Sequence, residues 1–557
     1  MIAPAGAAAA VPERCEGDPV RSPDRVITGS FPSEREGGFV FLPFRVPPPA
    51  TAVRVKYCYD QPEAPTSAQV RHTLDLGLYE PRDDPRRPWG TPEFRGWSGS
   101  GASDVTVSPQ GFSSEAAYEQ GERVSGKTSR SYRPGPVPAG RWAVELGLAS
   151  VASESEGDSD GAVAYRVEIK LRESRRLTRN PYRPPRYDHS PVRESDGWYS
   201  GDFHVHAEHS GDADATMTET FDYAFGSPAE DGAGLDFIAF ADHNTDTAWP
   251  EIGRYQDDHP RSLVIPSEEV TTYRGHLNGH AAGSQVNYRT GPLFSRASSG
   301  QLRLLRRARP ARAIFASLKR EGGFTQINHP TIFPSPGGAF ELCRGCPWEY
   351  SNEATGYRFV DAIEVATGPA SLDAPPDPGP NPFTVTAIEF WEDALDLGHK
   401  IAAVGASDSH RAGRTTDPTQ APIGEAATVV YADELSERAI ERGVEAGHTY
   451  VKVTGGDAPD LRLTARPSGS PGGPPAIMGD TLRASSAAFR ARVIGAAPGG
   501  GYTLIVVKDG EPLLSVPVTD DDFAFPFDSL GTGRYRIQLQ RSTRIETLSS
   551  PIYLEAP

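Results

Sequence analysis

Histidine and carboxylate side chains recur at short spacings through the middle of the chain, beginning with His204 and His206. On a strand these two imidazoles point to the same side, since side chains alternate between the two faces of a strand. Two neutral imidazoles on one face suit a borderline metal ion. Ten of the thirteen histidines lie between residues 201 and 410. This concentration predicts a metal site.

Further imidazoles and carboxylates continue the series, several of them directly after expected strands. They are Asp212, His243, Glu269, His276, His329, Asp408 and His410. Such ligands hold zinc, manganese or iron, and carboxylates also bridge neighbouring ions. Close ions lower the pKa of a bound water towards neutrality, which gives a hydroxide nucleophile without a serine or cysteine. The sequence has no Gly-x-Ser-x-Gly elbow and no P-loop, which argues against triad hydrolases and nucleoside triphosphatases.

Apolar strand patterns alternate with helical patterns around these residues. Segment 236–241 is apolar enough for a buried strand, 324–327 and 401–404 are further expected strands, and 313–318 and 385–395 are expected helices. Strands separated by helices predict βα units around a parallel sheet or barrel. Ligands at the C-terminal ends of strands fit that architecture, because such sheets gather functional groups at one rim.

The flanking regions have short alternating strands separated by turn residues, a pattern typical of β-sandwiches. The pattern predicts strands at 39–44, 52–57, 73–79, 142–147, 164–169, 502–507 and 535–539. The length of 557 residues exceeds what one core usually supports. We therefore expect a disordered or residual signal segment at 1–20, an N-terminal β-sandwich at 21–174, a linker at 175–195, the metal-binding domain at 196–456 and a C-terminal β-sandwich at 457–557.

Five motifs follow one another over about 210 residues: H-x-H at His204, A-D-H-N at His243, P-x-E-E-x-T-T-x-x-G-H ending at His276, N-H-P at His329 and S-D-S-H ending at His410. Together they resemble the PHP (polymerase and histidinol phosphatase) superfamily of metallohydrolases. The last motif and the flanking β-domains look most like its carbaryl-hydrolase-like CehA/McbA branch. The resemblance covers about half of the chain. It implies a multidomain protein with a central distorted (β/α)7 PHP-like barrel, flanked by N-terminal and C-terminal β-sandwich domains.

The resemblance also implies how the ligands divide among two or three divalent ions of zinc, manganese or iron. One ion takes His204, His206, Glu269 and Asp408; Glu269 bridges to a second ion at His276 and His329; a third ion takes Asp212, His243 and His410.

Three ligand assignments have alternatives. The first motif reads His-Ser-Gly-Asp where the family often has Ser-Asp-Gly, so His209 is an alternative to Asp212. Glu268 competes with Glu269 for the bridging role, although strand parity favours Glu269 because its neighbour points to the other face. His280, four residues after His276, is a lesser rival.

The predicted activity is hydrolysis of a phosphoester, such as a phosphomonoester or nucleotide, by a di- or trinuclear metal-dependent enzyme. The catalytic candidates are Asp408 and His410, with Arg274 and Arg411 placed to pair with a phosphate oxygen. A carboxylic or carbamic ester hydrolase is the first alternative, for which Trp348, Tyr350 and Phe333 are candidates for an apolar pocket. A non-catalytic secreted binding protein with a PHP-like scaffold is the second alternative.

Composition limits the partners of the protein. A net charge of -18 argues against tight binding to nucleic acid or anionic membrane, and the basic cluster at 303–312 is interpreted as a solvated helix face. The sequence contains no run of 18 apolar residues, so we expect no membrane span. The expected partner is a small-molecule ester. Four cysteines in a sheet-rich chain favour disulfides and a secreted or cell-envelope protein over a cytoplasmic one.

Overall fold

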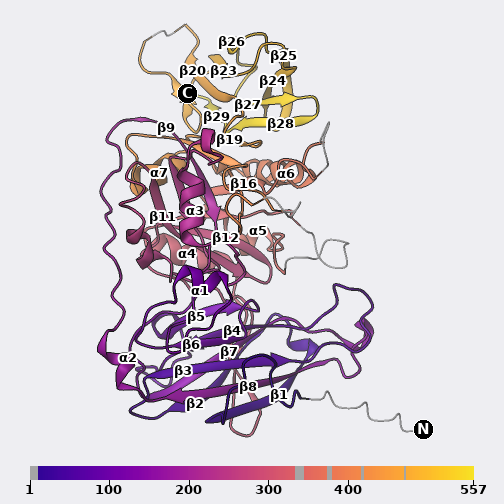
Figure 1. Ribbon diagram of the computed structural model, residues 1–557. Helices are drawn as coiled ribbons and strands as arrows, with labels where there is room; N and C mark the ends of the chain where they lie inside the picture. The colour runs from indigo at the N-terminus through magenta and orange to yellow at the C-terminus, as the bar shows by residue number, and fades with distance from the viewer. Residues whose placement is uncertain (1–10, 333–343, 373–378, 415–419, 470–471) are drawn as a thin grey trace, which may run out of the picture.

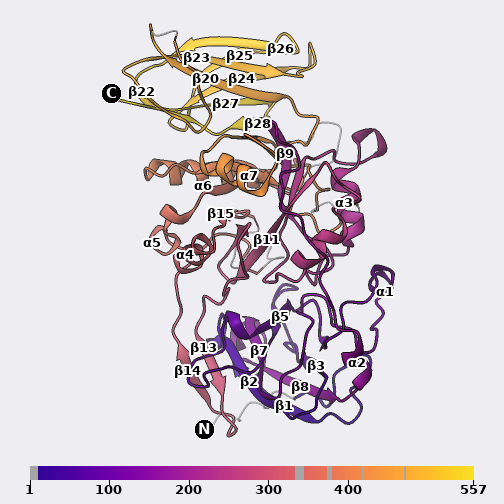
Figure 2. The same cartoon turned by 90° about the vertical axis from the view of Figure 1, so that its left-hand side faces the viewer.

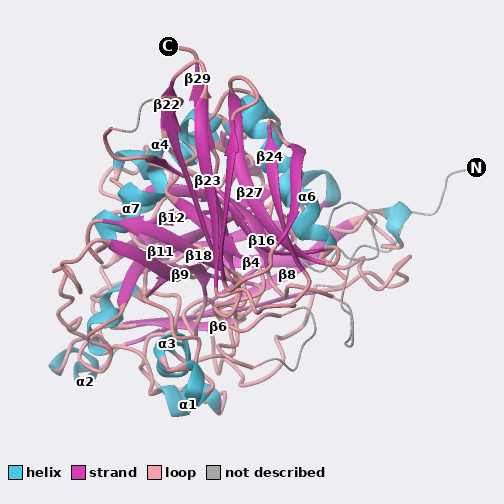
Figure 3. Ribbon diagram, turned by 90° about the horizontal axis from the view of Figure 1, so that it is seen from above, coloured by secondary structure: helices cyan, strands magenta, loops and turns pink. Residues whose placement is uncertain are grey.

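The computed structural model describes residues 11–332, 344–372, 379–414, 420–469 and 472–557. Along the long axis of the molecule, N-terminal sheets are followed by a central region with helices and then by C-terminal sheets (Figure 1). Strands dominate the view along this axis, with helices at the periphery (Figure 3). The protein is therefore a multidomain, sheet-rich chain.

Two antiparallel sheets face each other at the N-terminal end. One has the strand order β1-β8-β3-β6, and the other contains β2-β7-β4-β5. Apolar residues from both sheets share one core, in which Leu42, Val55, Leu76 and Val144 are fully buried. The N-terminal strands predicted from alternation are confirmed. The elements are β1 (Arg25–Pro32), β2 (Phe39–Val46), β3 (Ala52–Tyr59), β4 (Thr73–Tyr79), β5 (Phe94–Gly99), β6 (Asp104–Val107), α1 (Glu115–Glu119), β7 (Gly140–Ser150), β8 (Ala162–Arg172) and α2 (Arg175–Arg179).

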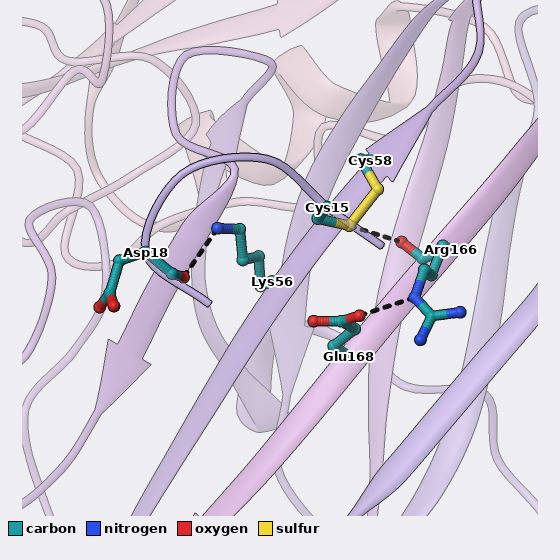
Figure 4. Close-up of a disulfide and its surroundings, with 6 residues drawn as sticks. All are labelled: Cys15, Asp18, Lys56, Cys58, Arg166 and Glu168. Carbon is teal, nitrogen blue, oxygen red and sulfur yellow. Dashed lines mark hydrogen bonds and ion pairs between the residues drawn. A yellow bond between two sulfur atoms is a disulfide. The ribbon is translucent and has the colours of Figure 1, made fainter. Parts of the chain in front are cut away.

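A disulfide ties the N-terminal segment to these sheets. Cys15 is bonded to Cys58 of β3, and the backbone carbonyl of Asp18 accepts a hydrogen bond from Lys56 over 2.9 Å (Figure 4). Cys15 is buried. The segment predicted to be disordered up to residue 20 is thus held against β3 from Cys15 onward, while residues 1–10 lie outside the described residues.

The hairpin of β13 (Leu293–Arg296) and β14 (Leu302–Arg306) leaves the central region and joins the N-terminal sheet. β13 pairs in parallel with β2, so the hairpin extends that sheet, and Figure 2 shows it among the N-terminal strands. The interpretation of the cluster at 303–312 as one helix face is therefore wrong, because Arg303 lies in a strand and α4 begins only at Arg312.

The central sheet has the strand order β17-β16-β15-β12-β11-β10-β9-β18-β19. Neighbours β9, β10 and β11 run parallel, as do β15, β16 and β17, but β12 runs antiparallel to both β11 and β15. The sheet is thus mixed, because a tight connection at Tyr273 and Arg274 makes β11 and β12 a hairpin. The strands are β9 (Gly197–Val205), β10 (Phe237–Phe240), β11 (Leu263–Thr272), β12 (Gly275–His280), β15 (Phe324–Ile327), β16 (Ala362–Thr367), β17 (Ala402–Ala406), β18 (Ala427–Ala432) and β19 (Thr449–Lys452).

The central sheet folds back on itself at one end, where the residues after its first edge strand meet β9. The residues just after β17 reach β9, where Ser409 forms a parallel bridge with Val205. Helices pack on the outside; α7, for example, is capped by Ser436 and buries Ile440 and Val444 with the sheet residue Val430. None of the described helices is long and apolar enough to cross a membrane. The helices are α3 (Met217–Phe225), α4 (Arg312–Arg320), α5 (Asn352–Thr355), α6 (Pro382–Asp396) and α7 (Glu437–Glu445).

The C-terminal sheets continue from the central sheet without a break, since β19 pairs with β28. The second C-terminal sheet, β21-β20-β23-β26, shows the expected alternation: in β23, Phe489 and Val493 are buried, while Arg490 and Arg492 are exposed. The strands are β20 (Asp460–Pro467), β21 (Ala476–Ile477), β22 (Thr481–Arg483), β23 (Ala487–Ile494), β24 (Tyr502–Lys508), β25 (Glu511–Pro517), β26 (Asp522–Asp528), β27 (Gly533–Arg541), β28 (Arg544–Ser549) and β29 (Ile552–Glu555).

Candidate metal centre

Four candidate ligands from three different strands converge at the end of the central sheet. They are His204 in β9, His206 just after it, Glu269 in β11 and Asp408 just after β17. One ligand atom from each lies within 4.8 Å of all the others. The two histidines and Glu269 are fully buried. This set has the size and the mixed nitrogen and oxygen donors of a divalent metal site.

Glu269 is shared with a second group. Its Oε1 atom lies 3.1 Å from Nδ1 of His276 in β12 and 3.3 Å from Nε2 of His329, which follows β15. His329 donates from Nδ1 to the backbone carbonyl of Cys346 over 3.0 Å, which directs Nε2 towards Glu269. The arrangement allows Glu269 to bridge two ions.

A third group lies on the other side of His206. Asp212 places one carboxylate oxygen 3.3 Å from Nε2 of His243 and the other 3.7 Å from Nε2 of His410. The two imidazole Nε2 atoms are 3.4 Å apart, and the ring of His410 stacks on that of His206 with centroids 4.1 Å apart. The structure therefore brings together all nine residues that the sequence proposes as ligands.

Two of these residues have unusual backbone conformations. His329 has φ of 25° and Asp408 has φ of 54°, although neither is a glycine. Positive φ values of this kind cost of order 1–3 kcal/mol in non-glycine residues and cluster at functional sites. At both positions the strain aims a side chain at the cluster immediately after a strand has ended.

Glu364 in β16 is a site residue that the sequence reasoning missed. Its Oε1 accepts a hydrogen bond from Nδ1 of His204 over 2.8 Å, and its Oε2 accepts one from the backbone N–H of His329 over 2.7 Å. It also accepts from Gln326 over 2.6 Å and from Thr367 over 2.8 Å. The sequence does carry a sign of this role. Glu364 is a carboxylate within a buried strand, and a carboxylate is rarely buried unless it is paired.

Burial and neighbouring charges set the pKa values in the cluster. Burial, with the charges of His410 and His243, lowers the pKa of His206 to about 3, so this imidazole is neutral. Burial opposes protonation of His204 as well, but Asp408, Glu269 and Glu364 raise its pKa well above the usual value. At Asp408 burial is outweighed by the charge of His204 and the hydrogen bond from His206, which lower its pKa. The carboxylates thus attract positive charge into a buried space.

Two polar atoms support the fit of a cation. His204 Nε2 and Glu269 Oε2 are buried without a hydrogen bond of good geometry; they lie against other candidate ligands, Nε2 3.3 Å from Oδ1 of Asp408 and Oε2 2.5 Å from Nδ1 of His243. Buried polar atoms without a hydrogen bond are costly and rare, so each calls for an explanation. Both belong to the group of four ligands, and a divalent ion among these atoms would satisfy them. The residues present therefore fit a metal ion.

A cavity of about 1110 Å³ opens onto the cluster. Its wall includes the candidate ligands Asp212, His243, His276, His329, Asp408 and His410. The lining also includes residues of the N-terminal region, among them Arg71, Asp75 and Trp97. The candidate metal centre therefore faces a cavity that two parts of the chain line.

The two arginines proposed for catalysis have different positions. Arg411 lines the cavity, with its Nε atom 3.1 Å from a carboxylate oxygen of Asp214. Arg274 is exposed, donates to the backbone carbonyl of Glu349 and lies over the ring of Tyr350. It is not among the cavity residues, because its position in the β11–β12 turn places it on the outer side of the hairpin.

The alternative ligands have other partners. His209 is buried against Phe112 and hydrogen-bonds Thr247 through Nδ1. Glu268 accepts from the backbone N–H of Val286, on the face opposite to Glu269, as strand parity predicts. His280 hydrogen-bonds through both ring nitrogens, to Ser267 and Gln326. None of the three belongs to a described group of metal-ligand atoms.

Of the aromatic residues proposed for a substrate pocket, the two that the structure describes do not line the cavity. Trp348 and Tyr350 are buried in the apolar core, where Trp348 packs beside Phe315, and Phe333 lies outside the described residues. Cys346 has its sulfur within 4.8 Å of ring nitrogens of His276 and His329, but it is disulfide-bonded and offers no thiolate.

Two solved structures are similar to this chain, both at low TM-scores. No family model matches the sequence, and neither does any curated protein sequence. A crystal structure of a two-domain protein from Bacteroides vulgatus, described as containing a predicted PHP-like metal-dependent phosphoesterase, aligns with 67% of this chain and 100% of its own at 14% identity and a TM-score of 0.33. An engineered protein aligns with 58% of this chain and 49% of its own at 12% identity and a TM-score of 0.14. At these TM-scores neither similarity carries an argument, so function rests on the geometry of the site.

Proposed function

We propose that this protein is a metal-dependent hydrolase whose substrate is a phosphoester. The observation that carries the proposal is the convergence of His204, His206, Glu269 and Asp408 within 4.8 Å of one another, beside a cavity that Asp408 lines. Divalent ions held there would polarise the oxygen under attack and lower the pKa of a coordinated water. Two or three ions would use the three groups described above, with Glu269 shared between two of them.

The residues at the site have different roles in the proposed reaction. The buried imidazoles and carboxylates fix the positions of the ions, and Glu364 orients His204. Asp408 and His410 belong to the ligand cluster and also line the cavity, so a substrate oxygen can approach them. Arg411 presents a guanidinium to the same cavity, where it can pair with a phosphoryl oxygen.

A carboxylic or carbamic ester is the second candidate substrate. Apolar side chains also line the cavity, among them Trp97, Tyr273, Leu372 and Phe383. An aryl ester would pack against such a wall. We prefer the phosphoester because Arg71 and Arg344 line the cavity together with Arg411.

The motif order supports the further proposal that the chain belongs to the PHP superfamily, in its carbaryl-hydrolase-like branch. In that case the central sheet, folded back from β17 to β9 through the Ser409 bridge, corresponds to the distorted barrel of these enzymes.

The test compares two substrates on one preparation. The protein is stripped with a chelator, reloaded with manganese or zinc, and assayed with an aryl phosphate and an aryl carboxylate ester. The proposal predicts metal-dependent turnover of the phosphate. Turnover of the carboxylate alone would support the second candidate, and a reloaded protein without activity on either would support a binding role.

A further inference from the structure

The loop between β9 and α3 carries Asp212, the one carboxylate of the third ligand group. It spans residues 207–214, and we call it the Asp212 loop. On the side of the central region, the backbone N–H groups of Asp214 and Ala215 donate to the carbonyl of His410 over 2.9 and 3.2 Å. These bonds fix the end of the loop. In its middle, His209 hydrogen-bonds Thr247 and the Ser210 hydroxyl accepts from the backbone N–H of His243, so the central region supplies part of the attachment.

Residues of the N-terminal region hold the beginning of this loop. Nη2 of Arg130 lies 3.2 Å from Oε1 of Glu208, and the two side chains are only 9% and 2% exposed. Arg130 is itself anchored, because its Nη1 donates to both the carbonyl and the hydroxyl of Ser113. This buried ion pair joins two parts of the chain at a position four residues before Asp212.

Two hydroxyl groups of the N-terminal region bracket Asp212 itself. The Ser131 hydroxyl donates to the backbone carbonyl of His209. On the other side, the Tyr118 hydroxyl donates to the carbonyl of Ala213 over 2.6 Å. Both bonds bind the backbone of the loop, so they restrict the direction in which Asp212 points without touching its carboxylate.

A backbone contact completes the attachment. A Cβ atom added to Gly101, in the turn between β5 and β6, would lie 2.4 Å from the carbonyl oxygen of Gly211. Real Cβ atoms do not approach so closely, so only glycine permits this contact. The turn of the N-terminal sheet therefore lies directly against the residue before Asp212.

We propose that the N-terminal region is a positioning element of the metal centre: Tyr118, Ser131, Arg130 and Gly101 fix the Asp212 loop and thereby complete the ion position at Asp212, His243 and His410. This inference rests on the proposed function, since it requires a metal centre. According to this inference, the N-terminal region helps to form the metal centre and is not only an accessory domain beside it.

The first test uses the conservative variant Tyr118→Phe, which removes one hydroxyl and keeps the ring. Ion number and affinity are measured by titrating the stripped full-length protein with manganese and counting bound ions by elemental analysis. We expect the affinity of one ion to fall about tenfold, since changes to groups that orient ligands cost 10–100-fold in metal affinity. The matched control is Tyr79→Phe, whose hydroxyl contacts Tyr288 in the same interface but not the loop; it should bind ions as the wild type does.

A double-mutant cycle separates positioning from general stability. Asp212→Asn should weaken the same ion, and adding Tyr118→Phe to it should have no further effect on ion affinity, because the hydroxyl acts through Asp212. Additive losses in the double variant would overturn the inference, as would wild-type affinity in Asp212→Asn.

Gly101→Ala provides an independent test, because the new methyl group must displace the Asp212 loop. Its control is Gly472→Ala, where an added Cβ meets nothing within 4 Å. We expect weaker binding of one ion in Gly101→Ala only. If Tyr118→Phe and Gly101→Ala both bind ions as the wild type does, the positioning role is wrong while the metal centre stands. If the wild-type protein binds no ion, both proposals are wrong.

Discussion

Nδ1 of His204 donates a hydrogen bond to Oε1 of Glu364 across 2.8 Å, and both side chains are fully buried. The bond leaves Nε2 of His204 directed at Glu269 and Asp408. A carboxylate behind a metal-binding imidazole fixes the ring and raises its basicity. Glu364 thus connects β16 to the ligands on β9 and to the backbone of His329.

Replacing this carboxylate should weaken metal binding. We expect Glu364→Gln to lower the affinity for manganese roughly 10–100-fold, because the amide can no longer hold His204 as a carboxylate does. Competition titration against a coloured chelator measures the change. Glu268→Gln is the control, since that buried side chain faces away from the cluster. Equal affinities in the two variants would contradict the role of Glu364.

A second buried ion pair should stabilise the join between the N-terminal and central regions. Nη1 of Arg289 lies 2.8 Å from Oε2 of Glu145 in β7, and both side chains are 1% exposed. Arg289→Met should lower the free energy of unfolding by about 3–5 kcal/mol, because it leaves a buried carboxylate without its partner. Urea denaturation followed by tryptophan fluorescence measures the loss.

An exposed pair provides the comparison for this variant. Arg492 and Asp522 also form an ion pair, but their side chains are 46% and 52% exposed. Arg492→Met should change the free energy of unfolding far less than Arg289→Met does, because solvent screens an exposed pair. If the free energy of unfolding falls equally in the two variants, burial does not make the Arg289–Glu145 pair more important than the exposed pair.

Asp75 should make the stability of the N-terminal region depend on pH. Burial, with the charge of Glu145, raises the pKa of Asp75 to about 7, against the hydrogen bond from Tyr273 that lowers it. The unfolded chain releases this proton near pH 4, whereas the folded protein keeps it up to about pH 7. The stability that the raised pKa of Asp75 gives the folded protein is therefore fully present at low pH, and it is lost as the pH rises from about 4 to about 7.

Asp75→Asn removes this titration and tests its sign. The unfolding free energy of the variant, relative to the wild type, should increase between pH 5 and pH 8 by an amount on the order of 2 kcal/mol. Denaturant titrations of both proteins at the two pH values measure the difference. A difference that is the same at both pH values would show that Asp75 keeps an ordinary pKa.

Much of the secondary structure could be predicted from the sequence, because alternation in the outer regions and apolar runs in the middle are strong local signals. The histidine motifs also indicated the members of the cluster, since each of these imidazoles lies in a strand or shortly after one. Local patterns cannot indicate which strands pair over long distances. The pairing of β13 with β2, for example, joins segments about 250 residues apart.

Two errors have specific physical causes. Leu302-Arg303-Leu304 alternates with a period of two, which indicates a strand, but the density of arginines suggested a helix face. Arg274 precedes the ligand His276 by two residues, yet the hairpin turn takes its side chain to the outer side. Sequence proximity to a ligand therefore does not ensure proximity to the site.

The central claim is that His204, His206 and their neighbours hold catalytic ions. The most direct test is elemental analysis of the purified wild-type protein and of the variant His204→Ala with His206→Ala, each after loading with manganese or zinc. We predict two or three ions per chain and phosphoester turnover in the wild type, and loss of both in the variant, with the outer sheets still folded by circular dichroism. Metal content and turnover that survive in the variant would contradict the account.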